Sequence, residues 1–172
     1  MSIKRLVLAS ALIMANPVLA SSPAGTPADI EQAVASVKAS KDNVQGAVSA
    51  LEAYAKQGNG DALLWLGRIY RDGLGGTPKD PKRAFSCFER AAGNEGKNNA
   101  AKYELARAYY YGEGTDKNLI GAYIWATLSL RTPSGERKEA QTLVSELTGM
   151  LSEEQLNSAK IIAEQIHDLY LD

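Results

Sequence analysis

The sequence has few of the side chains that enzymes and metal sites depend on. It contains one cysteine and one histidine in 172 residues. A lone cysteine, Cys87, cannot form a disulfide within the chain, so the fold must be stabilised by packing. Cys87 lies in an apolar stretch without an activating histidine nearby, and we therefore expect a small packed side chain rather than a reactive thiol.

Catalytic and ligand-binding motifs are also missing. The chain has no Gly-x-Ser-x-Gly, no Ser-x-x-Lys, no paired-cysteine zinc spacing and no Walker-type phosphate loop. His167 has no second histidine at ligand spacing, which favours a surface or helix-capping role. Residues 73–76 are glycine-rich but follow a predicted helix, so we interpret them as a turn. The sequence predicts no catalytic residue, no metal and no cofactor, and hence a protein that is not an enzyme.

Positive charge is scarce once the first residues are set aside. The formal net charge is −1, and removing Lys4 and Arg5 takes it to −3 because residues 1–20 contain no acid. The basic surface of a nucleic-acid-binding protein is therefore not expected.

Residues 1–20 are typical of a cleaved export signal. Lys4 and Arg5 precede a mostly apolar run from Leu6 to Ala20, which ends in small residues. That run is shorter than the roughly 20 residues a membrane-spanning helix needs. We expect cleavage after Ala20, a periplasmic or secreted location and no membrane anchor afterwards.

A repeat emerges when the chain is compared with itself. At an offset of 39 the matching pairs are Ala62 with Ala101, Leu66 with Leu105, Gly67 with Ala106, Tyr70 with Tyr109, Gly73 with Gly112 and Gly75 with Gly114. At an offset of 38 they are Asp80 with Asn118 and Ala84 with Ala122.

Each repeat unit is predicted to be a pair of helices joined by a glycine turn. The apolar residues recur at helical spacing, Gly73 and Gly112 are suited to end the first helices, and Asp80 and Asn118 to cap the second. The second helices should run over residues 82–93 and 119–130, the latter carrying Trp125. Neither hairpin can bury its apolar stripe alone, which predicts an all-α fold, a right-handed superhelical solenoid of stacked helix-turn-helix hairpins.

The expected organisation has four parts. We assign residues 1–20 to the signal, 21–43 to a flexible lead and a degenerate first helix, 44–131 to repeats and 132–172 to C-terminal capping helices. The repeats comprise two clear units at 60–95 and 99–131 and a degenerate one before them. The lead should cover residues 21–28, the first helix about 30–40, and Ser152 with Gln155 should form a capping box.

These landmarks resemble the Sel-one-like repeat, a longer relative of the tetratricopeptide repeat. The chain departs from the family pattern at Ala106, where glycine is usual, at Asn118, where aspartate is usual, and in lacking the paired cysteines of one exported branch. The resemblance implies an interaction scaffold without chemistry of its own.

The tetratricopeptide register further implies a partner-binding concave face. Its residues would be Leu64, Arg68, Arg71, Tyr103, Arg107 and Tyr110. Arg68 and Arg107 would stack into a cationic ladder suited to an acidic or extended segment, although arginines on such a face can simply be solvated.

Three functions stay open at this point. The first is a periplasmic scaffold or adaptor that binds a protein through the concave face. The alternative is an immunity protein that neutralises a secreted antibacterial toxin, and a minor alternative is a hydrolase of cell-wall fragments. The oligomeric state stays open.

Overall fold

The computed structural model describes residues 25–39, 44–93, 97–131 and 133–170, so the predicted signal at 1–20 lies outside the described residues. The described residues form eight α-helices and one short 3₁₀ turn, without a strand among them. The elements are α1 (Pro27–Lys38), α2 (Val44–Lys56), α3 (Gly60–Asp72), η1 (Leu74–Gly76), α4 (Pro81–Ala92), α5 (Asn99–Tyr111), α6 (Leu119–Ser129), α7 (Arg137–Met150) and α8 (Glu153–Tyr170). The predicted all-α class is confirmed.

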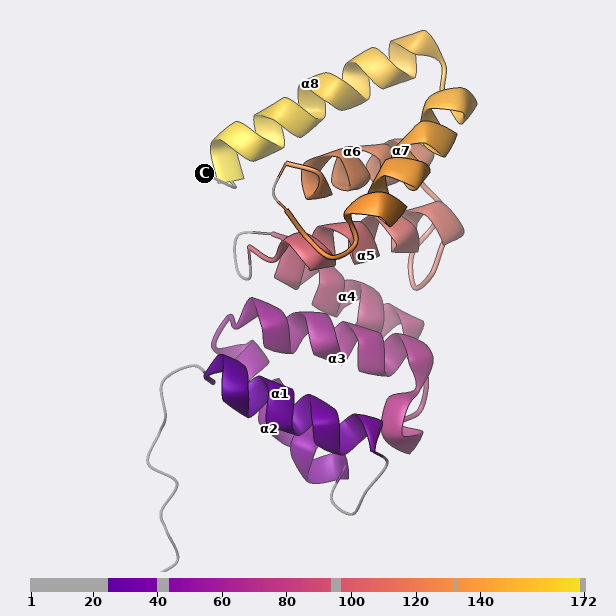
Figure 1. The fold of residues 1–172 in the computed structure, drawn as a ribbon. Helices are drawn as coiled ribbons and strands as arrows, with labels where there is room; N and C mark the ends of the chain where they lie inside the picture. The colour runs from indigo at the N-terminus through magenta and orange to yellow at the C-terminus, as the bar shows by residue number, and fades with distance from the viewer. Residues whose placement is uncertain (1–24, 40–43, 94–96, 132, 171–172) are drawn as a thin grey trace, which may run out of the picture.

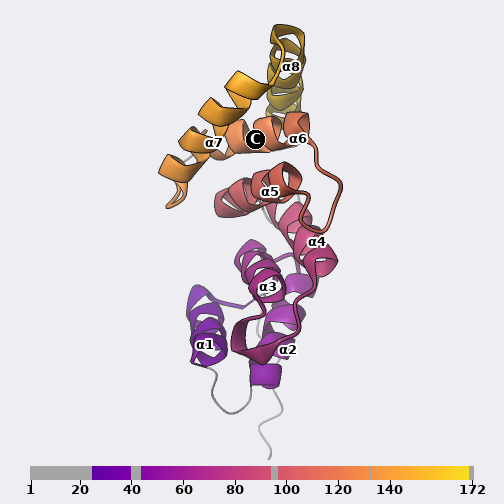
Figure 2. The same ribbon diagram turned by 90° about the vertical axis from the view of Figure 1, so that its right-hand side faces the viewer.

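The helices stack along one axis in chain order. Each helix from α1 to α6 packs on the next one along the chain, and α7 and α8 both pack on α6. Figure 1 shows the stack rising from α1 and α2 at one end to α8 at the other. In Figure 2, α1, α3, α5 and α7 lie on one side and α2, α4 and α6 on the other. We call the first side the odd-helix face.

Asparagine and aspartate side chains start the repeat helices. Asp80 Oδ1 accepts from the backbone N–H of Arg83 at 3.0 Å, and Asn118 Oδ1 accepts from Gly121 at 2.8 Å, so both predicted N-caps are confirmed. Asn59 and Asn98 cap α3 and α5 in the same way. These bonds satisfy amide groups that a helix leaves without partners in its first turn.

Glycine ends the first helix of each unit. Gly73 and Gly112 have φ values of 71° and 75°, in the left-handed region where a Cβ is costly. Two residues later, a Cβ on Gly114 would lie 2.0 Å from the carbonyl oxygen of Pro81. Glycine there lets the turn of the second unit pack against the start of α4.

The repeated apolar stripes form the core. Ala62, Leu66, Gly67 and Tyr70 are buried in the first unit, and Ala101, Leu105 and Ala106 in the second. Tyr109 is only partly buried and packs edge-to-face on Phe85. The close helix approach predicted at Gly67 is present, because a Cβ there would lie 2.4 Å from the ring of Phe88.

The ends of the chain partly differ from expectation. Helix α1 begins at Pro27 rather than near residue 30, because Thr26 and Asp29 form a capping box and Pro27 suits a first helical position. Residues 27 and 28 are therefore helical and not part of a flexible lead. The reciprocal hydrogen bonds between Ser152 and Gln155 confirm the predicted capping box. Of the helices described, none combines the length and apolar character needed to span a membrane.

Candidate functional site

Five of the six residues predicted for the concave face lie at least partly exposed on α3 and α5. Arg68 and Arg71 belong to α3, and Tyr103, Arg107 and Tyr110 to α5. Leu64 is the exception and needs correction. Its exposed fraction is 5%, because its side chain packs into the hydrophobic core, so it offers a partner no surface.

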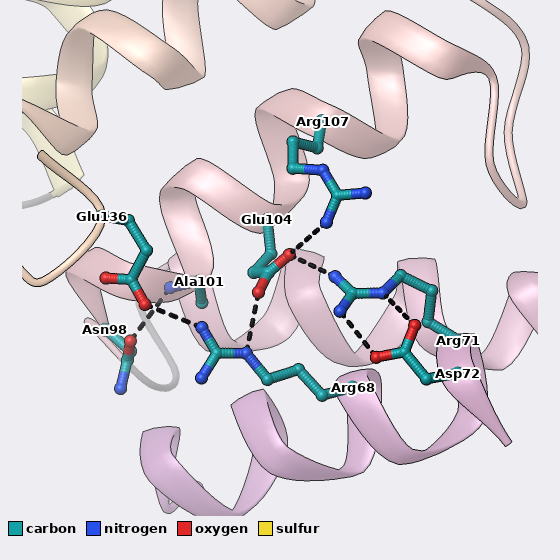
Figure 3. Close-up of polar contacts among 8 residues, drawn as sticks. All are labelled: Arg68, Arg71, Asp72, Asn98, Ala101, Glu104, Arg107 and Glu136. Carbon is teal, nitrogen blue, oxygen red and sulfur yellow. Dashed lines mark hydrogen bonds and ion pairs between the residues drawn. The ribbon is translucent and has the colours of Figure 1, made fainter. Parts of the chain in front are cut away.

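The three arginines converge on a single buried carboxylate, that of Glu104 on α5. Arg68 Nε donates to Glu104 Oε1 at 2.7 Å, and Arg107 Nη1 donates to Oε2 at 3.3 Å. Arg71 Nη1 also pairs with Oε2. Glu104 is only 5% exposed, whereas the three arginines are 18–28% exposed. Figure 3 shows the guanidinium groups pointing at Glu104 from α3 below and from the next turn of α5.

Two further carboxylates complete this cluster. Arg68 Nη2 donates to Glu136 Oε1 at 2.8 Å, and Arg71 binds both oxygens of Asp72 at 2.8 Å. The hydrogen bond from Arg71 lowers the pKa of the Asp72 carboxyl, and the same contact raises the pKa of Arg71. We call Arg68, Arg71 and Arg107 with Glu104, Asp72 and Glu136 the arginine–carboxylate cluster.

The cluster corrects the predicted cationic ladder. Three guanidinium groups meet three carboxylates, so their formal charges cancel. Arg68 and Arg107 are bridged by Glu104 instead of forming an uncompensated stack. These ion pairs connect α3 with α5 and with Glu136, the residue before α7. A buried charge that loses its partner is costly, so we expect the cluster to hold these elements together.

Tyrosine rings lie beside the cluster on α5. Tyr111 is 60% exposed, with the guanidinium of Arg107 5.7 Å from its ring centre. Tyr110 packs edge-to-face on Tyr111 at 4.9 Å and also packs on the second core cluster. The sequence prediction included Tyr110 but missed Tyr111, the more accessible of the two rings.

A hollow of about 220 Å³ opens between α5 and α7. The α5 wall carries an arginine and two tyrosines, and the α7 wall carries two glutamates. Its lining residues are Tyr103, Arg107, Tyr111, Glu139, Thr142, Leu143 and Glu146. We call this space the α5–α7 hollow. It is the part of the odd-helix face where aromatic, apolar and charged groups adjoin a concave surface.

A second hollow, of about 360 Å³, is lined by α2, α3 and α4. Tyr70 donates its hydroxyl proton to Glu52 at 2.7 Å, and Arg83 pairs with the same carboxylate at 2.9 Å. Burial, followed by the contact with Glu52, raises the pKa of Tyr70. Burial also raises the pKa of Cys87 to about 11, which fits the packed, unreactive thiol expected from the sequence. We call this space the α2–α4 hollow.

Candidate metal ligands do not cluster in the part of the chain that the structure describes. Within it, no group of three or more histidine, cysteine, aspartate or glutamate side chains could hold a metal ion. His167 lies half-buried in the last turn of α8.

Stacked helical hairpins with glycine-ended first helices define the class of α-solenoid repeat proteins. The family model of the Sel1 repeat matches residues 60–94 and 99–131. These two segments of the chain are Sel1-type repeats, as the repeat landmarks predicted. Such repeats generally mediate protein–protein interaction.

The chain is also similar to one protein in sequence and to another in structure. It is 31% identical over 99 residues to the alginate biosynthesis protein AlgK of Pseudomonas syringae pv. tomato, a match that covers 58% of this chain and 20% of AlgK. The crystal structure of c5321, a protective antigen of uropathogenic Escherichia coli with an SLR fold, superposes with a TM-score of 0.74 at 22% identity. That likeness covers 84% of this chain and 30% of c5321 and confirms the solenoid fold. The matched region is about a fifth of the length of the curated relative.

Proposed function

We propose that this protein is an exported interaction scaffold that binds an extended segment of a partner protein through the odd-helix face. The observation that carries the proposal is the α5–α7 hollow, where the exposed ring of Tyr111 adjoins Tyr103 and Arg107. Tyrosine and arginine are the residues that most often anchor protein interfaces, since both offer large contact areas with polar ends.

The ion pairs that link the surrounding helices support this proposal. The arginine–carboxylate cluster links α3 to α5 and reaches Glu136, which immediately precedes α7. A binding surface that is held in place before the partner arrives loses less conformational entropy on association. The cluster is thus suited to fix the shape of the face, and the hollow beside it to make the contact.

The structure favours an acidic partner less than the sequence did. An acidic segment would have to compete with Glu104, Asp72 and Glu136 for guanidinium groups that are already paired. Arg107 is the least engaged of the three, with one hydrogen bond at 3.3 Å. Of these three arginines, Arg107 is therefore the one best able to pair with an acidic partner.

Export and location belong to the same proposal. They rest on the basic and apolar pattern of residues 1–20, with the scaffold acting in the periplasm or outside the cell. AlgK, to which the chain is similar, is an alginate biosynthesis protein.

Capture of the partner from envelope extracts tests the proposal. The bait is the full chain with an affinity tag, compared with Tyr111→Ala and with Ile161→Ala as a matched control. Both side chains are 60% exposed, but Ile161 lies on α8. We expect Tyr111→Ala to lose the captured protein at least about tenfold and Ile161→Ala to retain it, with unchanged melting temperatures. Equal capture by both variants would rule out the odd-helix face. A single stoichiometric toxin would identify the scaffold as an immunity protein.

A further inference from the structure

We infer that the α5–α7 hollow accommodates a basic side chain, lysine or arginine, of the bound segment. The inference rests on the proposed function and reverses the partner charge that the arginines alone suggested. It follows from the carboxylates that remain unpaired, the aromatic wall and the size of the hollow.

Glu139 and Glu146 provide the charge. They are seven residues apart on α7, which places both on one side of the helix, and both line the hollow. Within the described part of the chain, neither carboxylate takes part in a hydrogen bond or ion pair. Both therefore still have their full acceptor capacity for a ligand.

Arg107 does not cancel these two charges. Its guanidinium already contributes to the arginine–carboxylate cluster, in which three positive and three negative groups balance. Adding Glu139 and Glu146 gives five carboxylates to three guanidinium groups. The hollow and the cluster together have a formal excess of two negative charges, which favours a cation.

The α5 wall suits the same kind of ligand. The rings of Tyr103 and Tyr111 lie opposite the two carboxylates, and the face of an aromatic ring attracts ammonium and guanidinium groups. The chain makes this kind of contact elsewhere, with Lys38 Nζ 4.3 Å from the ring centre of Trp65 and Lys117 Nζ 5.4 Å from that of Tyr110. Leu143 can pack on the methylene stem that both basic side chains carry.

The volume limits what can enter. At about 220 Å³, the hollow is smaller than the roughly 300–1,000 Å³ of pockets that hold whole small molecules. A single long side chain from an extended segment fits this size better. An acidic side chain would meet two like charges there.

Peptide titrations test the inference. The probes are acetylated, amidated pentapeptides Gly-Leu-X-Leu-Gly, in which X is arginine, lysine, norleucine or glutamate. They are added to the isotope-labelled full chain, and backbone amide shifts are followed by NMR. We expect the arginine and lysine peptides to shift amides of α5 and α7 and to bind about tenfold more tightly than the norleucine peptide, which is the gain of about one charge-assisted contact.

Two double variants provide the control. Glu139→Gln/Glu146→Gln should reduce the affinity for the arginine peptide to that for norleucine. Glu153→Gln/Glu154→Gln removes the same charge from the exposed first turn of α8 and should bind like wild type. Stronger binding of the glutamate peptide in the hollow, or an unchanged affinity in the first variant, would overturn the inference.

The outcomes also separate this inference from the proposed function. If the norleucine and arginine peptides bind the hollow equally, the face is correct and the basic preference is wrong. If none of the peptides shifts α5 or α7 and Tyr111→Ala still captures the partner, both ideas fail.

Discussion

The two repeat units share a backbone but differ in the side chains built on it. In both, an asparagine caps the first helix and a left-handed glycine ends it, Gly73 at φ 71° and Gly112 at φ 75°. In both, the tyrosine carbonyl near that end accepts from the cap of the next helix, at 2.8 Å for Asp80 and 2.9 Å for Asn118. The turn chemistry is therefore the constant part of the repeat.

The packing between the two helices of a unit differs, but the changes in side-chain size offset each other. Gly67 faces the ring of Phe88 in the first unit. The positions equivalent to these two in the second unit hold Ala106 and Ala126, both completely buried. A larger residue on the first helix thus accompanies a smaller one on the second, so similar spacing can be kept with different side chains.

The charged side chains of the two units differ without such compensation. Position 65 in the first unit is a tryptophan, and its equivalent 39 residues later is Glu104, the centre of the arginine–carboxylate cluster. The second unit therefore supplies the anion that pairs with arginines from both units. The repeated residues account for the stacking of the helices. Residues that differ between the units, such as Glu104, account for the arginine–carboxylate cluster.

The largest expected effect comes from disturbing the Gly67–Phe88 pair. Phe88→Ala should lower the free energy of unfolding by about 3–5 kcal/mol through the cavity it leaves. Gly67→Ala should cost about 1–3 kcal/mol, because its Cβ would meet the Phe88 ring at 2.4 Å.

The double variant Gly67→Ala/Phe88→Ala sharpens this comparison, because it gives the first unit the alanine pair of the second. Its loss should be smaller than the sum of the single losses by about 1–2 kcal/mol, measured by urea denaturation. Strict additivity would mean that the two packing solutions are not equivalent.

A smaller loss of stability is expected from replacing Glu104, which has no counterpart in the first unit. Glu104→Gln leaves three guanidinium groups without their shared carboxylate and should lower the free energy of unfolding by about 2 kcal/mol. This is less than for a fully buried ion pair, since the arginines are partly exposed. Glu139→Gln, on exposed and unpaired Glu139, should change it by less than about 0.5 kcal/mol. Equal losses in thermal or urea unfolding would show that the cluster does not clamp the helices.

The fold could be predicted where the chain repeats. Residues such as Leu66, Tyr70 and Gly73 recur because each unit must bury the same stripe and make the same turn, so the sequence contains that information twice. The start of α1 was missed although Thr26 and Asp29 formed a recognisable capping box. The proline and glycine residues around this capping box indicated a flexible lead instead.

The site could be predicted only in part. The arginines on α3 and α5 were identified from their register, but their partner Glu104 occurs once and has no counterpart at position 65. Tyr111 and Glu139 were missed for a related reason. The first lies one residue beyond the transferred register, and the second belongs to α7, outside the matched repeats. Charge pairing between distant residues depends on the packed structure and leaves no periodic trace.

Hydrogen–deuterium exchange on the chain with its captured partner tests the central claim most directly. The free and bound states of the full chain are compared peptide by peptide. We expect slower exchange in α5 and α7, which line the α5–α7 hollow, and unchanged exchange in α2 and α4. Protection confined to α2 and α4, with α5 and α7 unaffected, would contradict the assignment of the odd-helix face as the binding surface.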